Sequence, residues 1–304
     1  MRRGQHSETA EAMAAIRAGM CRYPVADRLV EDPFAERFVV GRYRFLAAIS
    51  RFAPARCLLR WGIEVLNPGA ISYIGLRHRT FDDALRKSLG SGVRRVVLLG
   101  AGFDSRALRF SSHGATFVEI DHPDTQAVKR AVLEKNGWFG TPRERIELRA
   151  ADLEAVPLRR VLDEIQAGVD PVLIIWEGVA WYLTEASVRQ TLADLAAWAP
   201  PGSELVFDTI DAAVVDGRRN DRAARAHRDY CRRRGEPIQW GLDRERAAPF
   251  LQEQGWALAQ LTPATAAAER YFTKETRLGQ PLPFMFFVFA TRGAPLRGAQ
   301  HRDL

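Results

Sequence analysis

Short apolar runs recur along the chain after residue 92, and segments with helical patterning separate them. The runs are Arg95–Leu99, Ala115–Ile120, Arg145–Arg149, Pro171–Trp176, Glu204–Phe207, Ala257–Leu261 and Phe284–Ala290. The helical segments are Asp104–Phe110, Asp124–Gly137, Leu158–Gln166, Glu185–Ala197, Val214–Arg234 and Asp243–Gln254. Several runs are apolar at every position, which is typical of strands covered on both faces. The alternation predicts a doubly wound α/β sheet, mostly parallel.

The first 90 residues show a helical pattern instead. The predicted helices are Ser7–Met20, Phe34–Ile49 and Gly69–Leu89. Ser7 is a candidate N-cap, Asp32-Pro33 can open the second helix, and Asn67-Pro68 can cap and open the third. Gly90-Ser91-Gly92 ends the third helix. We therefore divide the chain into an N-terminal helical cap over residues 1–92 and a sheet domain over residues 93–304.

Composition excludes several classes of protein. The 304 residues are 47% hydrophobic and 27% charged, as in an ordinary globular protein. No apolar stretch approaches the roughly 20 residues of a membrane-spanning helix, and Met1–His6 leads into no apolar signal region, so we expect a cytoplasmic protein. Three cysteines at long spacings, with no C-x-x-C and no H-E-x-x-H, exclude a disulfide framework and the common zinc motifs.

The chain is basic, with a formal net charge of +7. Only four of its 44 basic residues are Lys (Lys87, Lys129, Lys135 and Lys274). So strong a preference for Arg is typical of a biased genome composition. Since the Arg are scattered and form no stripe with interleaved aromatic residues, nucleic-acid binding is not favoured.

A glycine-rich turn follows the first predicted strand, with the sequence Gly100-Ala101-Gly102-Phe103-Asp104-Ser105-Arg106. Two glycines one residue apart allow a tight turn that brings backbone N–H groups against a ligand. A dinucleotide fingerprint has a third Gly or Ala where Ser105 stands, so the match is partial. Asp121, 19 positions after Gly102, ends the second strand and can accept hydrogen bonds from both ribose hydroxyls. The spacing favours nucleoside binding over a plain turn.

Two more strand ends carry candidate chemistry. Asp152 follows the third strand, where it can accept a hydrogen bond from the amino group of adenine or serve as a turn residue. Glu177 follows the fourth strand, with Trp181 and Tyr182 close behind. Ligands of such sheets lie beyond the carboxyl ends of the strands, where strand order reverses. We therefore expect Glu177, Trp181 and Tyr182 to line a pocket, although either aromatic residue could belong to the core.

Basic residues cluster at Arg77-His78-Arg79 on the last cap helix and at 232–234. Helical neighbours point about 100° apart, so we expect one of the first three to face the cleft and the others to be solvated. The second cluster is interpreted as a solvated helix end, where cations suit the helix dipole.

Taken together, four segments resemble the leucine carboxyl methyltransferase family. They are Arg77–Leu85, Val96–Arg106, Glu119–Pro123 and Trp176–Thr184, and the resemblance covers roughly residues 10–290. The chain is especially similar to the bacterial branch, which includes polyketide O-methyltransferases, and Asp32-Pro33-Phe34-Ala35 fits that branch. The resemblance implies a class I methyltransferase that uses S-adenosylmethionine, with a Rossmann-like sheet of seven strands whose last strand is antiparallel.

The resemblance also implies residue roles. It places Gly100, Ala101 and Gly102 against the methionine part of the cofactor, Asp121 at the ribose, Asp152 and Leu153 at the adenine, and Glu177 in the same pocket. It places Arg77 and Tyr182 at the carboxylate groups of the reacting centre, with Arg77 also among the cofactor contacts. It implies no metal. The eukaryotic members carry a Lys near the N-terminus, for which Arg17, Arg22 or Arg28 could substitute only loosely.

The resulting hypothesis is O-methylation of a carboxylate on a small acidic metabolite. A carboxylate is already ionised at pH 7 and needs no general base. A hydroxyl acceptor is the alternative, and it would need a base such as His78, His122 or Asp208. A nicotinamide dehydrogenase or an RNA-binding methyltransferase on the same core is less favoured. The sequence leaves the oligomeric state open.

Overall fold

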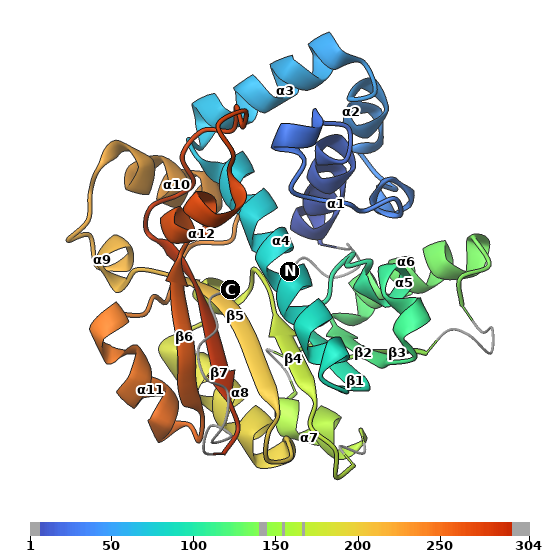
Figure 1. Ribbon diagram of the computed structural model, residues 1–304, viewed down its shortest axis with the longest axis vertical. Coiled ribbons are helices and arrows are strands. Elements are labelled where there is room, and N and C mark those ends of the chain that lie inside the picture. Colours follow the sequence, from blue (N-terminus) through green and yellow to red (C-terminus); the bar gives the residue numbers. More distant parts are fainter. Residues whose placement is uncertain (1–6, 140–144, 154–155, 166–167, 294–304) are drawn as a thin grey trace.

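The computed structural model describes residues 7–139, 145–153, 156–165 and 168–293. Within these ranges one sheet has the strand order β3-β2-β1-β4-β5-β7-β6 (Figure 1). The strands are β1 (Arg95–Leu99), β2 (Thr116–Asp121), β3 (Ile146–Ala150), β4 (Leu173–Trp176), β5 (Glu204–Ile210), β6 (Ala257–Pro263) and β7 (Met285–Thr291). Strands β1 to β5 pair in parallel, and β7 runs antiparallel to β5 and β6. The predicted fold is confirmed.

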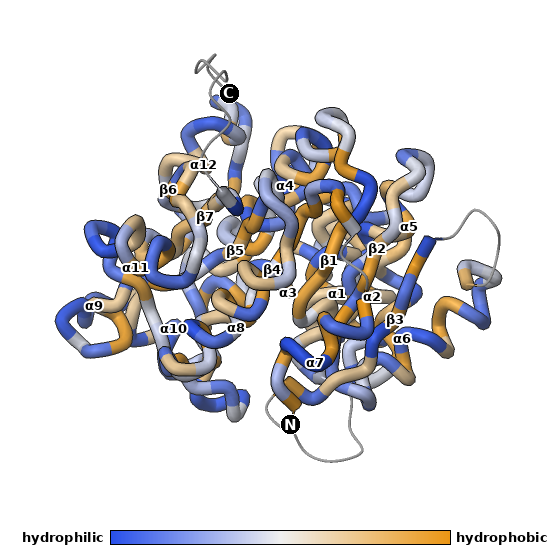
Figure 2. Tube along the Cα trace, turned by 90° about the horizontal axis from the view of Figure 1, so that it is seen from below, coloured by the Kyte–Doolittle hydropathy of each residue, from blue (hydrophilic) through white to orange (hydrophobic). Residues whose placement is uncertain are grey.

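Helices cover both faces of the sheet. They are α5 (Arg106–Arg109), α6 (Pro123–Lys135), α7 (Leu158–Asp163), α8 (Glu185–Trp198), α9 (Ala212–Val215), α10 (Arg222–Arg233), α11 (Ala247–Glu253) and α12 (Ala264–Tyr271), with the short 3₁₀ turns η3 (Ser111–His113), η4 (Ala180–Tyr182) and η5 (Arg244–Arg246). The helices α7, α8 and α11 pack against one face of the strands, and α5 and α12 against the other. Figure 2 shows the central strands as largely hydrophobic, because their residues are buried between these two layers.

The helices before the sheet lie over one of its ends (Figure 1). They are α1 (Glu8–Met20), η1 (Val25–Asp27), η2 (Ala35–Phe38), α2 (Arg44–Ile49), α3 (Ala53–Leu66) and α4 (Ala70–Gly90). Ser7 caps α1 as predicted, since its hydroxyl accepts the Ala10 N–H at 3.1 Å. The continuous helix predicted over Phe34–Ile49 is wrong: the chain forms η2, a turn that contains Gly41, and then α2. Helix α3 was not predicted.

The predicted N-cap at Asn67 is wrong as well. Asn67 ends α3, and its buried side chain contacts His227. Gly69 takes the N-cap position of α4 with a φ of 86°, and a Cβ there would lie 2.7 Å from the Gln280 carbonyl oxygen. The close approach of that neighbouring backbone therefore requires glycine and fixes where α4 begins.

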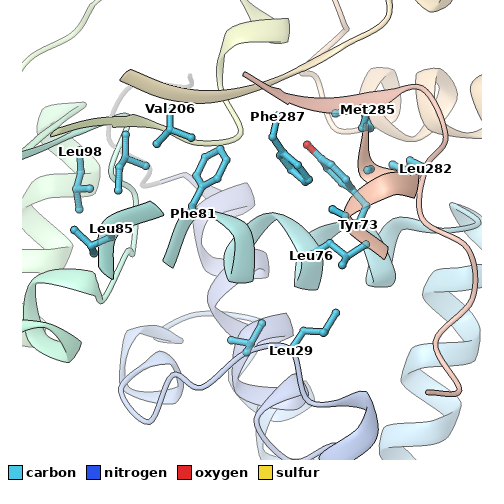
Figure 3. Packing of buried hydrophobic residues seen from close by; sticks show 14 of the residues in the cluster. Leu29, Tyr73, Leu76, Phe81, Leu85, Leu98, Val206, Leu282, Met285 and Phe287 are labelled. Carbon is cyan, nitrogen blue, oxygen red and sulfur yellow. The ribbon is translucent and has the colours of Figure 1, made fainter. Parts of the chain in front are cut away.

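Helix α4 lies between the sheet and the other cap helices. Figure 3 shows Tyr73 and Phe81 pointing towards Phe287 of β7, while Leu76 faces Leu29 of the cap. Tyr73 stacks on Phe287 with ring centroids 6.0 Å apart. Because both faces of α4 are covered, polar residues on it are held in fixed positions.

Several other boundaries differ from the predictions. The helix predicted over Val214–Arg234 is two helices, α9 and α10, separated by a loop in which Gly217 has a positive φ. The helix predicted from Leu158 ends at Asp163, and its predicted end at Gln166 lies outside the described residues, as does the N-terminal stretch Met1–His6.

Candidate functional site

A cavity of about 510 Å³ lies where the sheet meets the cap, beyond the carboxyl ends of β1, β2 and β4. It is lined by most of the residues predicted for a site: Arg77, Gly100, Ala101, Gly102, Asp121, Asp152, Leu153, Glu177 and Tyr182. The expectation that Trp181 also lines the pocket is wrong, because its side chain is buried in the hydrophobic core. Strands β1 and β4 are neighbours, so strand order reverses there. A second cavity of about 590 Å³, between α2 and α6, contains none of these residues. The first cavity is therefore the candidate site.

The glycine-rich turn forms part of the cavity wall. Gly100 and Gly102 both have positive φ, 66° and 48°. A Cβ at Gly100 would lie 2.7 Å from Cγ2 of Val179, and one at Gly102 would lie 3.1 Å from Cβ of Ala10. Side chains at these positions would be strained and would fill the space that the turn leaves open. The turn thus needs glycine for its own conformation and for access to the cavity.

Asp121 stands next to this turn. Its Oδ2 accepts the Gly102 N–H at 2.6 Å and its Oδ1 accepts the His122 N–H at 2.7 Å. Burial raises the pKa of Asp121, and these two N–H groups oppose the rise. Each carboxylate oxygen has two acceptor lone pairs, so one per oxygen remains for a ligand. The backbone thus holds Asp121 ready to accept two hydroxyl groups.

Asp152 and Leu153 continue the wall beyond β3. The Oδ2 of Asp152 lies 3.8 Å from Nε2 of His122. Leu153 is 37% exposed although it is apolar, and its exposed surface lines the cavity. A carboxylate beside an apolar surface suits a flat heterocycle that bears an amino group.

Arg77 reaches the cavity from α4. Its Nε donates to Oε1 of Glu177 at 3.0 Å, and its Nη1 lies 3.5 Å from Oδ2 of Asp208. Burial alone would lower the pKa of Arg77, but the two carboxylates raise it well above its usual value. The Nη2 lies 3.9 Å from the sulfur of Met13, a weak acceptor. Arg77 is therefore oriented on two sides and keeps strong donor capacity on the third.

Glu177 connects Arg77 to a buried charge network. Its Oε2 lies 2.6 Å from Nη1 of Arg106, whose side chain is fully buried and also pairs with Asp82 and Asp104. Burial would raise the pKa of Glu177, but Arg106 and Arg77 hold it well below its usual value. Glu177 is thus a fixed carboxylate in the floor of the cavity.

The expectation that one of the three adjacent basic residues faces the cleft is confirmed by Arg77, but the expectation that the other two are solvated is wrong for His78. Arg77 and His78 both line the cavity, while the half-exposed Arg79 pairs with Asp83. Both ring nitrogens of His78 contact arginines, Arg106 at 3.2 Å and Arg109 at 3.0 Å. Burial and Arg106 lower the pKa of His78. Its imidazole belongs to the buried network.

Tyr182 lies in η4 and lines the cavity near Glu236. Burial raises the pKa of Tyr182 well above its usual value, and the neighbouring Cys231 and Glu236 raise it further. Its hydroxyl therefore stays protonated at neutral pH and can donate a hydrogen bond.

Several lining residues were not predicted. They are Thr9 and Met13 of α1 and Glu236 and Gln239 after α10. The Thr9 hydroxyl donates to Oε2 of Glu236 at 2.8 Å, which joins two segments 227 residues apart. No local motif marks these residues, since only the packing of α1 brings them together. Arg17, one of the three arginines weighed in place of the family lysine, also lines the cavity, pairing with Asp32 at 2.9 Å.

Within the described ranges, no set of three or more His, Cys, Asp or Glu side chains is arranged to hold a metal ion. Among the same residues, no helix has the length and apolar character needed to cross a membrane.

The chain is similar to known proteins over most of its length. The family model described as leucine carboxyl methyltransferase matches residues 10–196. A protein of Parafrankia sp. strain EAN1pec, named as an S-adenosyl-L-methionine-dependent methyltransferase, is 33% identical over 266 residues, covering 86% of this chain and 80% of the relative. One of Mycobacterium sp. strain JLS with the same name is 30% identical, covering 86% and 87%. A crystal structure from Thermobifida fusca, described as a methyltransferase, superposes with a TM-score of 0.58 at 14% identity, over 96% of this chain and 97% of that one.

Proposed function

This chain belongs to the leucine carboxyl methyltransferase family, and on that premise we propose that it transfers a methyl group from S-adenosylmethionine to a carboxylate oxygen of a small acidic metabolite. The observation that carries the proposal is the position of Arg77. Glu177 and Asp208 orient this buried cation, and its Nη2 lies 3.9 Å from the thioether sulfur of Met13 in the cavity wall.

The cavity fits the cofactor that the relatives are named for. The glycine-rich turn leaves space at Gly100 and Gly102 because neither residue has a Cβ. This space would admit the methionine part of the cofactor. The remaining lone pairs of Asp121 suit two ribose hydroxyls. Asp152 and Leu153 suit an adenine ring, through one acceptor and one apolar surface. When bound, S-adenosylmethionine supplies an electrophilic methyl group on a positively charged sulfur.

The acceptor chemistry follows from the state of the neighbouring groups. His78 contacts two arginines, and Asp208 accepts the Gly178 N–H at 2.7 Å and the Tyr73 hydroxyl. The Nδ1 of His122 accepts the Asp124 N–H at 3.2 Å. Each base weighed for a hydroxyl acceptor is thus already engaged. This favours a nucleophile that is ionised without help, and a carboxylate has a pKa near 4.

In the proposed reaction the residues orient and desolvate the acceptor. Nη2 of Arg77 donates to one carboxylate oxygen, and the Tyr182 hydroxyl can donate to the same group. The other oxygen forms the new bond to the methyl carbon while the carbon–sulfur bond breaks. The products are a methyl ester and S-adenosylhomocysteine. Helix α1 covers the cavity and keeps water from the ester.

The test is to incubate the protein with S-adenosylmethionine and a library of small acids and phenols, and to follow mass by mass spectrometry. We expect one methyl group to be added to an acid and lost again in mild base, because esters hydrolyse and ethers do not. Base-stable addition to a phenol would overturn the proposal.

Variants at two neighbouring arginines sharpen this test. Arg77→Met should lower turnover by at least about 100-fold, since about 3 kcal/mol is typical of losing a charged hydrogen bond at a buried site. Arg79→Met, one position along on the solvent side, should leave turnover unchanged. Wild-type turnover in Arg77→Met would remove this residue from the reacting centre.

A further inference from the structure

Helix α3 turns an apolar face to solvent. None of its 14 residues is buried. Leu58, Trp61 and Val65 are 65%, 64% and 51% exposed. Phe52 at its N-cap and Leu66 at its end are 68% and 56% exposed. In Figure 1, α3 runs along the edge of the molecule farthest from the sheet. We call Pro54, Leu58, Trp61 and Val65 the α3 stripe.

The polar residues of α3 face the other way. Nη1 of Arg56 donates to the Ser50 carbonyl at 2.9 Å, and Nη1 of Arg60 donates to Asp27 at 3.3 Å. Glu64 accepts the Gly69 N–H at 2.7 Å. A surface helix ordinarily buries its apolar side and exposes its charges. In α3 this arrangement is largely reversed. Polar contacts and the partly buried Ile63 attach the helix to the rest of the molecule, and the stripe has no cover within the described residues.

The spacing of the stripe indicates what covers it. Its four residues follow one another at intervals of four, three and four positions. This is the repeat with which one helix packs its side chains between those of another. A helix of 14 residues is about 21 Å long at 1.5 Å per residue. The stripe therefore offers three helical turns of contact to a second helix.

With the neighbouring Phe52 and Leu66, the α3 stripe reaches the size of the largest apolar patches that monomers expose. Aromatic side chains present about 150–250 Å² each, and Phe52 and Trp61 are each about two-thirds exposed. These two residues therefore contribute on the order of 300 Å², and Leu58, Val65 and Leu66 add to it. A monomer rarely exposes more than roughly 300–600 Å² of contiguous apolar surface.

The charges distinguish a protein partner from a membrane. A helix that lies on a lipid surface exposes Lys or Arg beside its apolar face, but Arg56 and Arg60 are drawn inwards. The core of a protein interface is poor in charge and rich in aromatic residues, as the α3 stripe is. A second copy of the chain brings an identical stripe, and a two-fold axis makes such a stripe complementary to itself.

Gly62 adds an independent observation. A Cβ at this position would meet nothing within 4 Å, so the fold of a single copy does not require glycine there. Glycine inside a helix costs about 1 kcal/mol relative to alanine. Beside the stripe, its small size would allow the backbone of a second helix to approach closely.

We propose that a second copy of this chain packs its own α3 against the α3 stripe, forming a homodimer about a two-fold axis. The test is sedimentation equilibrium of the whole chain from nanomolar to high-micromolar concentration. The wild type should be a dimer, and Leu58→Glu and Trp61→Glu should each weaken the dimer by at least about 30-fold, as loss of a central contact does. Val169→Glu, at an apolar residue 90% exposed elsewhere, is the matched control and should not change the mass.

A second measurement avoids any effect of the substitutions on folding. Cys57 is exposed on α3, one turn before Trp61, whereas Cys21 is half-buried and Cys231 buried. A bismaleimide should therefore link two wild-type chains, and Cys57→Ser should abolish the product. A wild type that stays monomeric, a dimer that both glutamate variants leave intact, or a monomer that binds phosphatidylglycerol vesicles through Trp61 would each overturn the proposal.

Discussion

The two ends of the cavity are built in different ways. The strand end consists of Gly100, Gly102, Asp121 and Asp152, and the cap end consists of Thr9, Met13, Tyr182 and Glu236. Parallel pairing of β1, β2 and β3 brings the strand-end residues together, since the carboxyl ends of these strands share one edge. The cap end joins segments such as α1 and the loop after α10, which contact across 227 positions.

This difference indicates which substitutions each end tolerates. At the strand end, backbone groups hold the side chains, as Gly102 and His122 hold Asp121. At the cap end, the side-chain hydrogen bond from Thr9 to Glu236 joins α1 to the loop after α10. We therefore expect ligand contacts at the strand end to be strong and specific, and those at the cap end to be weaker and adjustable.

The largest effect, on the stability of the fold, is expected at Arg106, in the buried charge network that holds Glu177. Arg106→Met would leave the buried carboxylates of Asp82, Asp104 and Glu177 without their shared cation. Removing one partner of a buried ion pair costs about 3–5 kcal/mol. Urea denaturation should show that the free energy of unfolding falls by this amount. Arg79→Met, whose ion pair is partly exposed, should lower the free energy of unfolding by less than about 1 kcal/mol. Equal losses would mean that the network does not support the site.

The strand end could be predicted from the sequence because its signals are local. The two glycines, the acidic residue 19 positions later and the apolar strands before them are all short-range patterns. The seven strands were located to within about three residues for the same reason. Each of the site residues predicted at this end lies in the cavity, and their roles remain predictions.

Apart from Tyr182, which follows the fourth predicted strand, the cap end could not be predicted, because no short pattern encodes it. Thr9 and Met13 lie in an Ala-rich helix that contains no recognisable motif, and Glu236 lies in a loop. The same limit explains Asn67, whose Asn-Pro sequence suggests an N-cap. The backbone around Gln280, more than 200 residues away, decides instead that α4 begins after Gly69.

The next effect tests the strand end itself. Asp121→Asn should lower the affinity for S-adenosylhomocysteine by about 10- to 100-fold, because a hydrogen bond to a charged acceptor is worth about 1.5–3 kcal/mol. Titration calorimetry measures the affinity. Asp124→Asn removes the same charge nearby but outside the cavity, and it should change affinity less than about twofold. If both variants bind S-adenosylhomocysteine with the same affinity, Asp121 acts only through its negative charge at a distance and does not contact the ligand.

A smaller effect concerns Asp208, below Arg77. Burial raises the pKa of Asp208 to about 6, although Arg77 and the Tyr73 hydroxyl oppose the rise. Because the folded state holds this proton more tightly than the unfolded chain, the stability it provides is present below pH 4 and is lost as pH rises through 6. The free energy of unfolding of the wild type, measured relative to that of Asp208→Asn, should therefore fall by about 1.4 kcal/mol between pH 5 and pH 7.

Urea denaturation of both proteins across that range measures the difference in slope. Other titrating groups, such as Glu119 with a pKa raised by burial to about 7, are present in both proteins and cancel. Parallel stability curves would show that Asp208 is ionised throughout and that Arg77 rests on two charged carboxylates.

The smallest effect is expected at the cap end. Thr9→Val removes the hydrogen bond from Thr9 to Glu236 across the cavity without changing the volume of the side chain. Loss of one partly exposed hydrogen bond costs about 0.5–1.5 kcal/mol. The KM for the acid that accepts the methyl group should therefore rise by about two- to tenfold. Affinity for S-adenosylhomocysteine should stay within about twofold, because the strand end is unchanged. Thr262→Val, on the exposed side of β6, is the matched control. A parallel loss of both affinities would mean that α1 positions the whole cavity and that its two ends are not independent.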